Sequence, residues 1–378
     1  MSPTHIIVAG NLLDGCTTQA RRQVLLTVEE GIITAIEAAP QLTDQARAAL
    51  TDFSHCTLVP PLVDCSLSLA SSAAVGWPPA APADATGQLS AMERRRRHAL
   101  YCHLHGVLGI ADNDQPEPPT NGAAGTTPTG LVEWRAAGPD FLRLVYTANI
   151  EDGFPDRELG EAALNRALEG RHGRPAVVVA NGRQPVAAAL KAGCEAIEQG
   201  YGMGEDNLRT MARRGVLWIP SLLRARNALD GASGGGSVCC RFSQRYVAPG
   251  KPDPGARAFW QKTLAAQLAQ LRRARELGVT TALGTGAGSH GIIHGESMVE
   301  EMKLFIKAGY SLAESIRCAS ANGAAFFGLQ KLGTLSTGSP ATFLVSRGTL
   351  AQLPRKLSYL EAIYIDGAPS ALYHKDPR

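Results

Sequence analysis

The chain has 378 residues, of which 44% are hydrophobic and 19% are charged, and its formal net charge is +3. This length suits one large domain with a small one beside it, and the composition is that of an ordinary soluble globular protein. The small net charge gives no reason to expect a nucleic-acid or membrane partner, and no apolar run approaches the ~20 residues that span a bilayer.

Short strands open the chain. A hairpin is predicted over residues 24–38, because aliphatic residues alternate on both sides of a Glu-Glu-Gly turn. Similar strands, separated by Gly, Ser and Pro, return over 332–348 and 361–369. We therefore predict that the two chain ends, 1–58 and 331–378, build one small β-sandwich domain.

Between these ends, strands alternate with helices. The predicted strands are 58–69, 106–112, 141–147, 176–180, 196–198, 217–220 and 279–284. A helix is clearest over 257–277, where apolar residues recur every three or four positions. Alternation on this scale is typical of a (β/α)8 barrel, which we predict over 59–330. Pro-, Gly- and Ala-rich stretches interrupt the alternation and are candidate lids: 71–90, 115–130 and 229–255.

The eight cysteines are scattered without the spacing of a metal site or a redox motif. We therefore expect free thiols in a reducing compartment. Structured sequence begins at His5 with no secretory signal before it, which also favours a cytoplasmic protein. The adjacent Cys239 and Cys240 lie in a Gly-rich stretch, and the sequence assigns them no role.

Segments in the second half resemble a known family. They are "VVVANGRQPVAAALKAGCEAIEQGY" from Val177, "ELGVTTALGTGAGSHGIIHGES" from Glu276 and "LGTLSTGSPATFLV" from Leu332. These strings resemble the amidohydrolase superfamily, in the branch of imidazolonepropionases and metal-dependent prolidases. The resemblance implies a β-sandwich and a (β/α)8 barrel whose strand ends hold one or two divalent metals.

The chain departs from this family at the metal ligands. The resemblance implies four histidines, a carboxylated lysine and an aspartate, and the matching positions hold other residues: Ser66, Ser68, Arg143, Val179, Gln199 and Gly286. Hydroxyls and a carboxamide are poor zinc ligands, and the guanidinium of Arg143 would repel a cation. Gly286 also removes the base that would activate water. We therefore predict no metal and no cofactor.

We expect polar side chains to line the barrel mouth: Ser66, Ser68, Asp112, Arg143, Tyr146, Asn181, Gln199 and Tyr201. His290 and His294, in the loop after the last strand, are catalytic candidates together with Arg143 and Asp112. A buried guanidinium needs a counter-charge, so we expect Arg143 to pair with Asp112 or with a bound anion. Because Ser66 and Ser68 should face the barrel interior, the neighbouring Cys65 should face the helix layer.

The sequence leaves more than one function open. The first is a catalytically degenerate homologue that binds a small molecule, of which an anion is one candidate, or a partner; a homo-oligomer and a complex with an active paralogue both fit it. The second is a metal-independent hydrolase or lyase that acts on a small carboxylate- or amide-containing substrate through Arg143 and His290 or His294. The third is an amide or C–N hydrolase with a displaced metal. The first is favoured, because no replacement forms a recognisable acid, base and nucleophile set.

Overall fold

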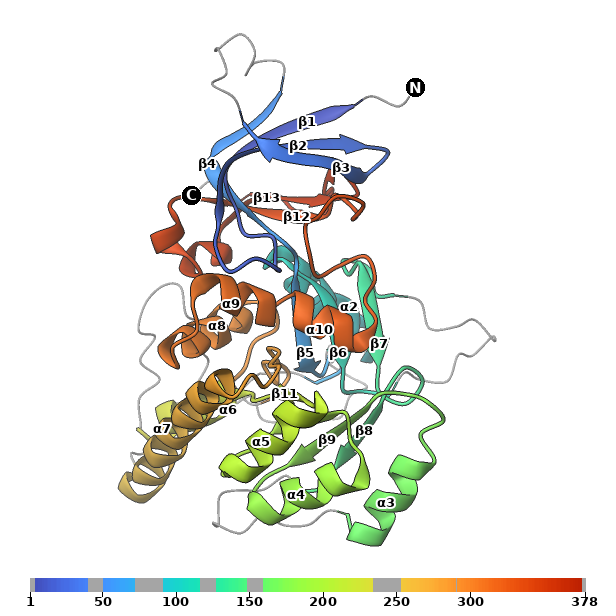
Figure 1. Ribbon diagram of the computed structural model, residues 1–378, viewed down its shortest axis with the longest axis vertical. Helices are drawn as coiled ribbons and strands as arrows, with labels where there is room; N and C mark the ends of the chain where they lie inside the picture. The colour runs from blue at the N-terminus through green and yellow to red at the C-terminus, as the bar shows by residue number, and fades with distance from the viewer. Residues whose placement is uncertain are drawn as a thin grey trace, which may run out of the picture.

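Both chain ends contribute to one seven-stranded sheet, at the top of Figure 1. The computed structural model describes residues 4–39, 50–71, 91–115, 127–147, 159–233, 253–289 and 291–375. The strands of this sheet are β1 (His5–Leu12), β2 (Arg21–Glu29), β3 (Ile32–Ala38), β4 (Thr51–Val59), β12 (Phe343–Arg347), β13 (Leu360–Ile365) and β14 (Ala368–Pro369). Their order is β14-β13-β12-β4-β1-β2-β3, so the predicted β-domain built from both ends is confirmed. Its exact boundaries stay a prediction.

The predicted hairpin is β2–β3. Glu30 and Gly31 have φ of 50° and 80°, and positive φ at both central residues matches the twist of a two-residue hairpin turn. The sheet curls so that its β3 edge meets the segment before β12. Gly31 O accepts from Ala341 N at 2.7 Å, and Ile33 N donates to Ser339 O at 2.9 Å. The enclosed core is apolar: Ile7, Leu26, Ile33, Leu58, Phe343 and Val345.

Two parallel sheets form the barrel wall. One holds β5 (Leu62–Leu67), β6 (Val107–Asp112) and β7 (Glu133–Ala136); the other holds β8 (Leu142–Val145), β9 (Ala176–Ala180), β10 (Ala196–Gln199) and β11 (Leu217–Ile219). Residues 280–287 join them on one side, since Trp218 N donates to Thr280 O and Cys65 N donates to Leu283 O, both at 2.9 Å. On the other side Gly138 N donates to Phe141 O at 2.8 Å and links β7 to β8. The predicted (β/α)8 barrel is confirmed.

Helices cover the outside of this wall (Figure 1). They are α2 (Ala91–Leu104), α3 (Glu161–Glu169), α4 (Arg183–Ala192), α5 (Glu205–Arg214), α6 (Leu222–Ala232), α7 (Pro254–Glu276), α8 (Ser297–Lys307), α9 (Leu312–Cys318) and α10 (Ala321–Phe327). The predicted helix over 257–277 is α7, which begins with Asp253 accepting from Ala256 N at 3.0 Å. Within the described residues, no helix is both long and apolar enough to cross a membrane.

Two strand predictions differ from the structure. The strand β7 was not predicted, because its sequence "EWRA" carries two charges and only its last residue is buried. The predicted strand over 279–284 forms no regular ladder: isolated bridges occur at Thr281, within it, and at Ala287, just after it. Gly284 ends this segment and Gly286 and Gly288 follow it, and glycine weakens a strand.

Candidate functional site

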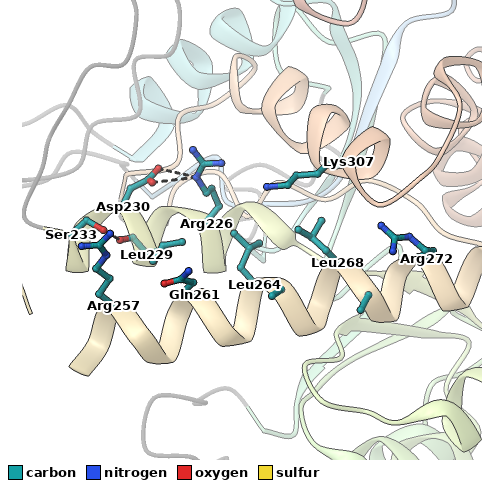
Figure 2. A pocket seen from close by; sticks show the side chains of 12 residues that line it. Arg226, Leu229, Asp230, Ser233, Arg257, Gln261, Leu264, Leu268, Arg272 and Lys307 are labelled. Carbon is teal, nitrogen blue, oxygen red and sulfur yellow. Dashed lines mark hydrogen bonds and ion pairs between the residues drawn. The ribbon is translucent and has the colours of Figure 1, made fainter. Parts of the chain in front are cut away.

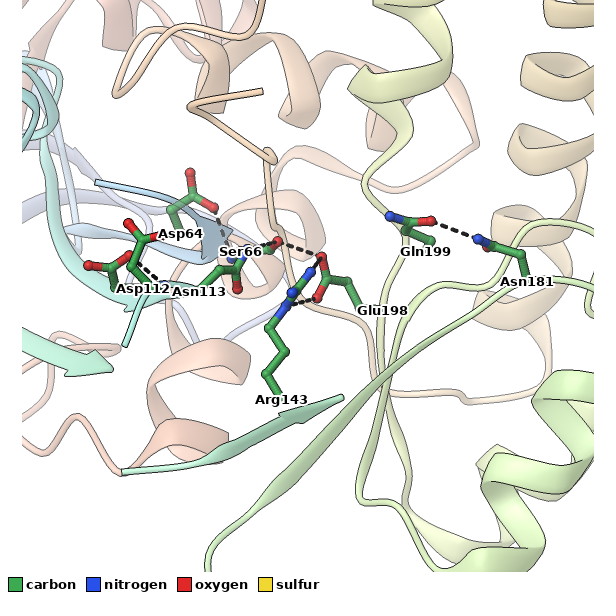
Figure 3. Close-up of polar contacts among 9 residues, drawn as sticks. Asp64, Ser66, Asp112, Asn113, Arg143, Asn181, Glu198 and Gln199 are labelled. Atoms are coloured by element: carbon green, nitrogen blue, oxygen red, sulfur yellow. Dashed lines mark hydrogen bonds and ion pairs between the residues drawn. The ribbon is translucent and has the colours of Figure 1, made fainter. Parts of the chain in front are cut away.

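A hydrogen-bonded ion pair lies inside the barrel (Figure 3). Arg143 of β8 donates from Nε to Glu198 Oε2 at 2.8 Å and from Nη2 to Oε1 at 3.0 Å. Ser66 of β5 donates from Oγ to Glu198 Oε1 at 2.7 Å and accepts from Asn113 Nδ2 at 3.1 Å. Because β5 belongs to one sheet and β8 and β10 to the other, these side chains meet across the interior.

The pair is almost excluded from water. The side chains of Arg143 and Glu198 are 19% and 5% exposed. Burial opposes ionisation of Glu198, but the charge and hydrogen bonds of Arg143, with the Ser66 hydroxyl, outweigh it and hold the pKa of the carboxyl below its usual value. Glu198 is therefore a carboxylate whose oxygens accept from two neighbours.

The expected Arg143–Asp112 pair is wrong, because Glu198 takes the guanidinium. Asp112 Oδ1 instead accepts from the backbone N–H groups of Leu69 at 3.2 Å and Asp114 at 3.1 Å. Burial and the neighbouring Asp114 raise the pKa of Asp112 to about 7.

Sequence reasoning set Glu198 aside as a structural residue, but the structure places it on the guanidinium of Arg143. Its neighbour in the parallel register between β9 and β10 is Val179, and residues side by side in parallel strands point to the same face. Val179 was already placed facing the interior. Glu198 therefore faces the same space as Val179, but the pairing of β9 with β10 that brings it there is not contained in the sequence of one chain.

Asp64 ties β5 to the segment that closes the barrel. Its Oδ1 accepts from Thr285 N at 2.9 Å and Ser66 N at 3.2 Å, and its Oδ2 accepts from Thr285 Oγ1 at 2.5 Å. Burial raises the pKa of Asp64 to about 6, although these hydrogen bonds act in the opposite direction. Asp64 thus holds in place the strand end that carries Ser66.

Ser68 and His294 form a separate polar group. Ser68 Oγ donates to both carboxylate oxygens of Asp114, at 2.9 and 2.8 Å, and His294 Nε2 lies 2.8 Å from Ser68 O. The His294 ring stacks on His98 with centroids 3.9 Å apart. Burial and then His98 lower the pKa of His294 to about 3, so the ring is neutral and Nε2 donates to the carbonyl. His290, the other predicted histidine, lies outside the described residues.

The remaining predicted pocket residues lie around Asn181. Its Nδ2 donates to Gln199 Oε1 at 2.7 Å, and its Oδ1 accepts from Tyr201 N at 3.0 Å. The hydroxyl of Tyr201 donates to Ser221 O at 3.0 Å. Figure 3 shows the Asn181–Gln199 pair apart from the Arg143–Glu198 pair. Tyr146 is fully buried and donates its backbone N–H to Val179 O.

Two of the expected ligand positions have no side-chain donor atom. Val179 is 1% exposed and lies in β9. Gly286 has a φ of 70° and donates its N–H to Ser66 O at 2.7 Å.

The outward orientation of Cys65 is confirmed. Its Sγ lies against α10, because a Cβ added at Gly323 of that helix would collide with it.

A sequence model of the amidohydrolase family matches residues 175–366, just over half of the chain. This chain belongs to the amidohydrolase family. Uncharacterised proteins of Mycobacterium tuberculosis and Mycobacterium bovis are 25% identical to this chain over 201 residues, which is 51% of this chain and 48% of theirs. The chain therefore spans about half the length of the curated relatives it matches.

Solved structures share the amidohydrolase fold over nearly the whole chain. A Xaa-Pro dipeptidase with bound methionine superposes with a TM-score of 0.73 at 18% identity, covering 97% of this chain and 100% of that one. A molinate hydrolase gives 0.71 at 14% identity, covering 98% and 95%. The ochratoxinase of A. niger gives 0.69 at 16% identity, covering 97% and 95%. At these identities the likeness shows the fold alone.

The metal centre that the family resemblance implies does not fit the residues found here. The cationic guanidinium of Arg143 stands where the resemblance assigns an anionic ligand, and Glu198, the nearest carboxylate, is bound to it. The Ser66 hydroxyl donates to the same carboxylate and accepts from Asn113, so its proton and one of its two lone pairs are in use. Throughout the described part of the chain, no group of three or more His, Cys, Asp or Glu side chains is placed to hold a metal.

Proposed function

We propose that this amidohydrolase homologue is catalytically degenerate: it keeps the family barrel to bind a small molecule or a partner, and it does not carry out metal-assisted hydrolysis. The observation that supports this most directly is the fork between Arg143 and Glu198, with Ser66 bonded to the same carboxylate. A permanently charged cation at this position is incompatible with a divalent metal beside it.

The same network gives no activated nucleophile. Ser66 donates to Glu198, but a carboxylate whose pKa is held below its usual value is a weak base. A hydroxyl needs a stronger base beside it to attack a carbonyl carbon. The geometry therefore supports a structural role for Ser66.

A metal-independent hydrolase or lyase is the second candidate, and two contacts weigh against it. The guanidinium fork of Arg143 already holds Glu198, which leaves it poorly placed to clamp a substrate carboxylate. His294 is neutral and its Nε2 donates to Ser68 O. Asp112 is the observation in favour of this candidate, because a pKa of about 7 suits a general acid or base.

The test combines metal content, stability and hydrolysis, with an active prolidase assayed in parallel. Protein expressed with added zinc and manganese should retain less than roughly 0.1 metal equivalents after dialysis, and added zinc should not raise its melting temperature. Xaa-Pro dipeptides and N-acyl amino acids should not be hydrolysed above background. Stoichiometric metal together with hydrolysis that a chelator abolishes would show that the proposal is wrong. Hydrolysis that persists with the chelator would instead support the metal-independent enzyme.

A further inference from the structure

A groove of about 600 Å³ runs along α6 and α7 on the outer helical layer, and Lys307 of α8 also lines it (Figure 2). Asp253 N donates to Ala232 O at 2.9 Å, which places the beginning of α7 beside the end of α6. The two helices are therefore antiparallel, and the groove is the valley between them. Leucines from both helices form its floor: Leu229, Leu264 and Leu268.

The rim of the groove is strongly positive. Arg226, Arg257, Arg272 and Lys307 line it, against one carboxylate, Asp230. Asp230 already pairs with Arg226 at 3.2 Å. Arg257 and Lys307 are exposed and make no ion pair with any residue that the structure describes. An occupant must therefore bring negative charge.

The spacing of the cations favours a chain segment over a small anion. Arg257 and Arg272 are fifteen positions apart on α7, which corresponds to about 22 Å along a helix. A valley between two antiparallel helices, with an apolar floor, has the shape that receives a third helix.

Charge also decides between the candidate occupants. A second copy of this chain, docked groove to groove, would bring the same excess of arginine and lysine against itself. The segment 234–252, which connects α6 to α7, contains Arg241, Arg245 and Lys251 and no aspartate or glutamate. It too would add positive charge. Nucleic acid would match the charge but would leave the leucine floor unused.

We propose that the α6–α7 groove binds an acidic amphipathic helix of a partner protein. Leucine-type side chains of that helix lie on Leu229 and Leu268, which are partly exposed, and its carboxylates lie near Arg257, Arg272 and Lys307. This surface is separate from the Arg143–Glu198 site inside the barrel, so it does not depend on the proposed function.

The test measures binding of a designed peptide to the 378-residue chain by fluorescence anisotropy. The probe is a labelled helical peptide of about 16 residues, with leucines on one face and glutamates along both edges. Three matched ligands accompany it: the same peptide with lysine for glutamate, the same peptide with serine for leucine, and a duplex DNA of similar length. The acidic, leucine-bearing peptide should bind at least roughly tenfold more tightly than each of them.

Charge-reversal variants test whether the peptide binds in the groove. The double variant Arg257→Glu/Lys307→Glu should weaken binding of the acidic peptide roughly tenfold. The control variant Lys191→Glu changes a lysine of α4 that is also exposed but does not line the groove, and it should bind the peptide as the wild type does. Unchanged binding by the double variant, or equal weakening by Lys191→Glu, overturns the proposal. Equal binding of DNA or of the leucine-free peptide also overturns it, because the groove would then be a non-specific polyanion surface.

Discussion

Arg143 and Glu198 are joined by two nearly parallel hydrogen bonds, Nε to Oε2 at 2.8 Å and Nη2 to Oε1 at 3.0 Å. This bidentate arrangement is the strongest form of a side-chain ion pair. The two residues come from β8 and β10, with β9 between them, so the pair spans three strands. Its loss should therefore affect the stability of the barrel as well as the chemistry of its mouth.

Removal of one partner should be costly. Arg143→Ala leaves Glu198 buried and charged without its cation, and the free energy of unfolding should fall by about 3–5 kcal/mol. The double variant Arg143→Met/Glu198→Leu should recover part of this loss, because no charge is then left buried. Urea denaturation followed by circular dichroism measures both. A loss below about 1 kcal/mol for Arg143→Ala would mean that water replaces the partner.

A small anion should substitute for the missing carboxylate. In Glu198→Ala, acetate or propionate can enter the space beside the guanidinium of Arg143 and raise the melting temperature. The wild type should not respond, because Glu198 already fills the fork. Chloride at equal ionic strength and the double variant Arg143→Ala/Glu198→Ala are the controls. An equal response of the wild type would indicate an anion site elsewhere.

Stability should fall as the pH rises from about 4 to about 6, through Asp64. An aspartate in the unfolded chain has a pKa of about 3.9, whereas burial raises the pKa of Asp64 to about 6. Between these values the folded state binds more protons than the unfolded state, so a rise in pH favours unfolding. Above pH 6 the contribution is constant.

Asp64→Asn should remove that part of the pH dependence. Its free energy of unfolding relative to the wild type should improve between pH 4 and pH 6.5. Asp206→Asn, at an exposed position, should follow the wild type across this range. Parallel profiles for the wild type and Asp64→Asn would contradict the assignment. Glu198 has the opposite effect at lower pH. Its pKa is lower in the folded state than in the unfolded state, so the free energy of unfolding falls as the pH falls below the usual pKa of glutamate.

Two neighbouring glycines should respond differently to alanine. A Cβ at Gly284 would lie 2.5 Å from Ile219 Cγ2 and 2.8 Å from Ser66 Cβ, so Gly284→Ala should cost about 2–4 kcal/mol through overpacking. A Cβ at Gly286 would meet nothing closer than 3.9 Å, so Gly286→Ala should cost about 1–2 kcal/mol, from its φ of 70° alone. Thermal unfolding of both variants gives the comparison. The reverse order would contradict the packing around Ser66.

The barrel could be predicted from sequence because each of its main strands and helices has a recognisable residue pattern within its own short stretch of chain. Apolar runs such as 176–180 and 217–220 mark buried strands, and the helical period of 257–277 marks α7. The strand β7 could not be predicted in this way. Its residues Glu133 and Arg135 are only partly buried, and it is a strand because it pairs with β6.

The site was predicted in part. The inward orientation of Ser66 and the outward orientation of Cys65 follow from alternation within one strand, and the structure agrees. The partner of Arg143 depends on the register between β8, β9 and β10, which the sequence of one chain does not contain. Asp112 was a reasonable partner by charge, but its Oδ1 accepts from the backbone N–H groups of Leu69 and Asp114 and its Oδ2 from Trp134 Nε1.

The position of β4 in the terminal sheet has a consequence for synthesis on the ribosome. One edge of β4 pairs with β1, but the other pairs with β12, which follows about 280 residues later, from Val59 to Phe343. At 5–20 residues per second, that edge stays unpaired for roughly 15–60 s after β4 emerges. An unpaired strand edge is a template for aggregation. The nascent chain must therefore protect β4, by transient contacts or a chaperone, until the entire barrel has been translated.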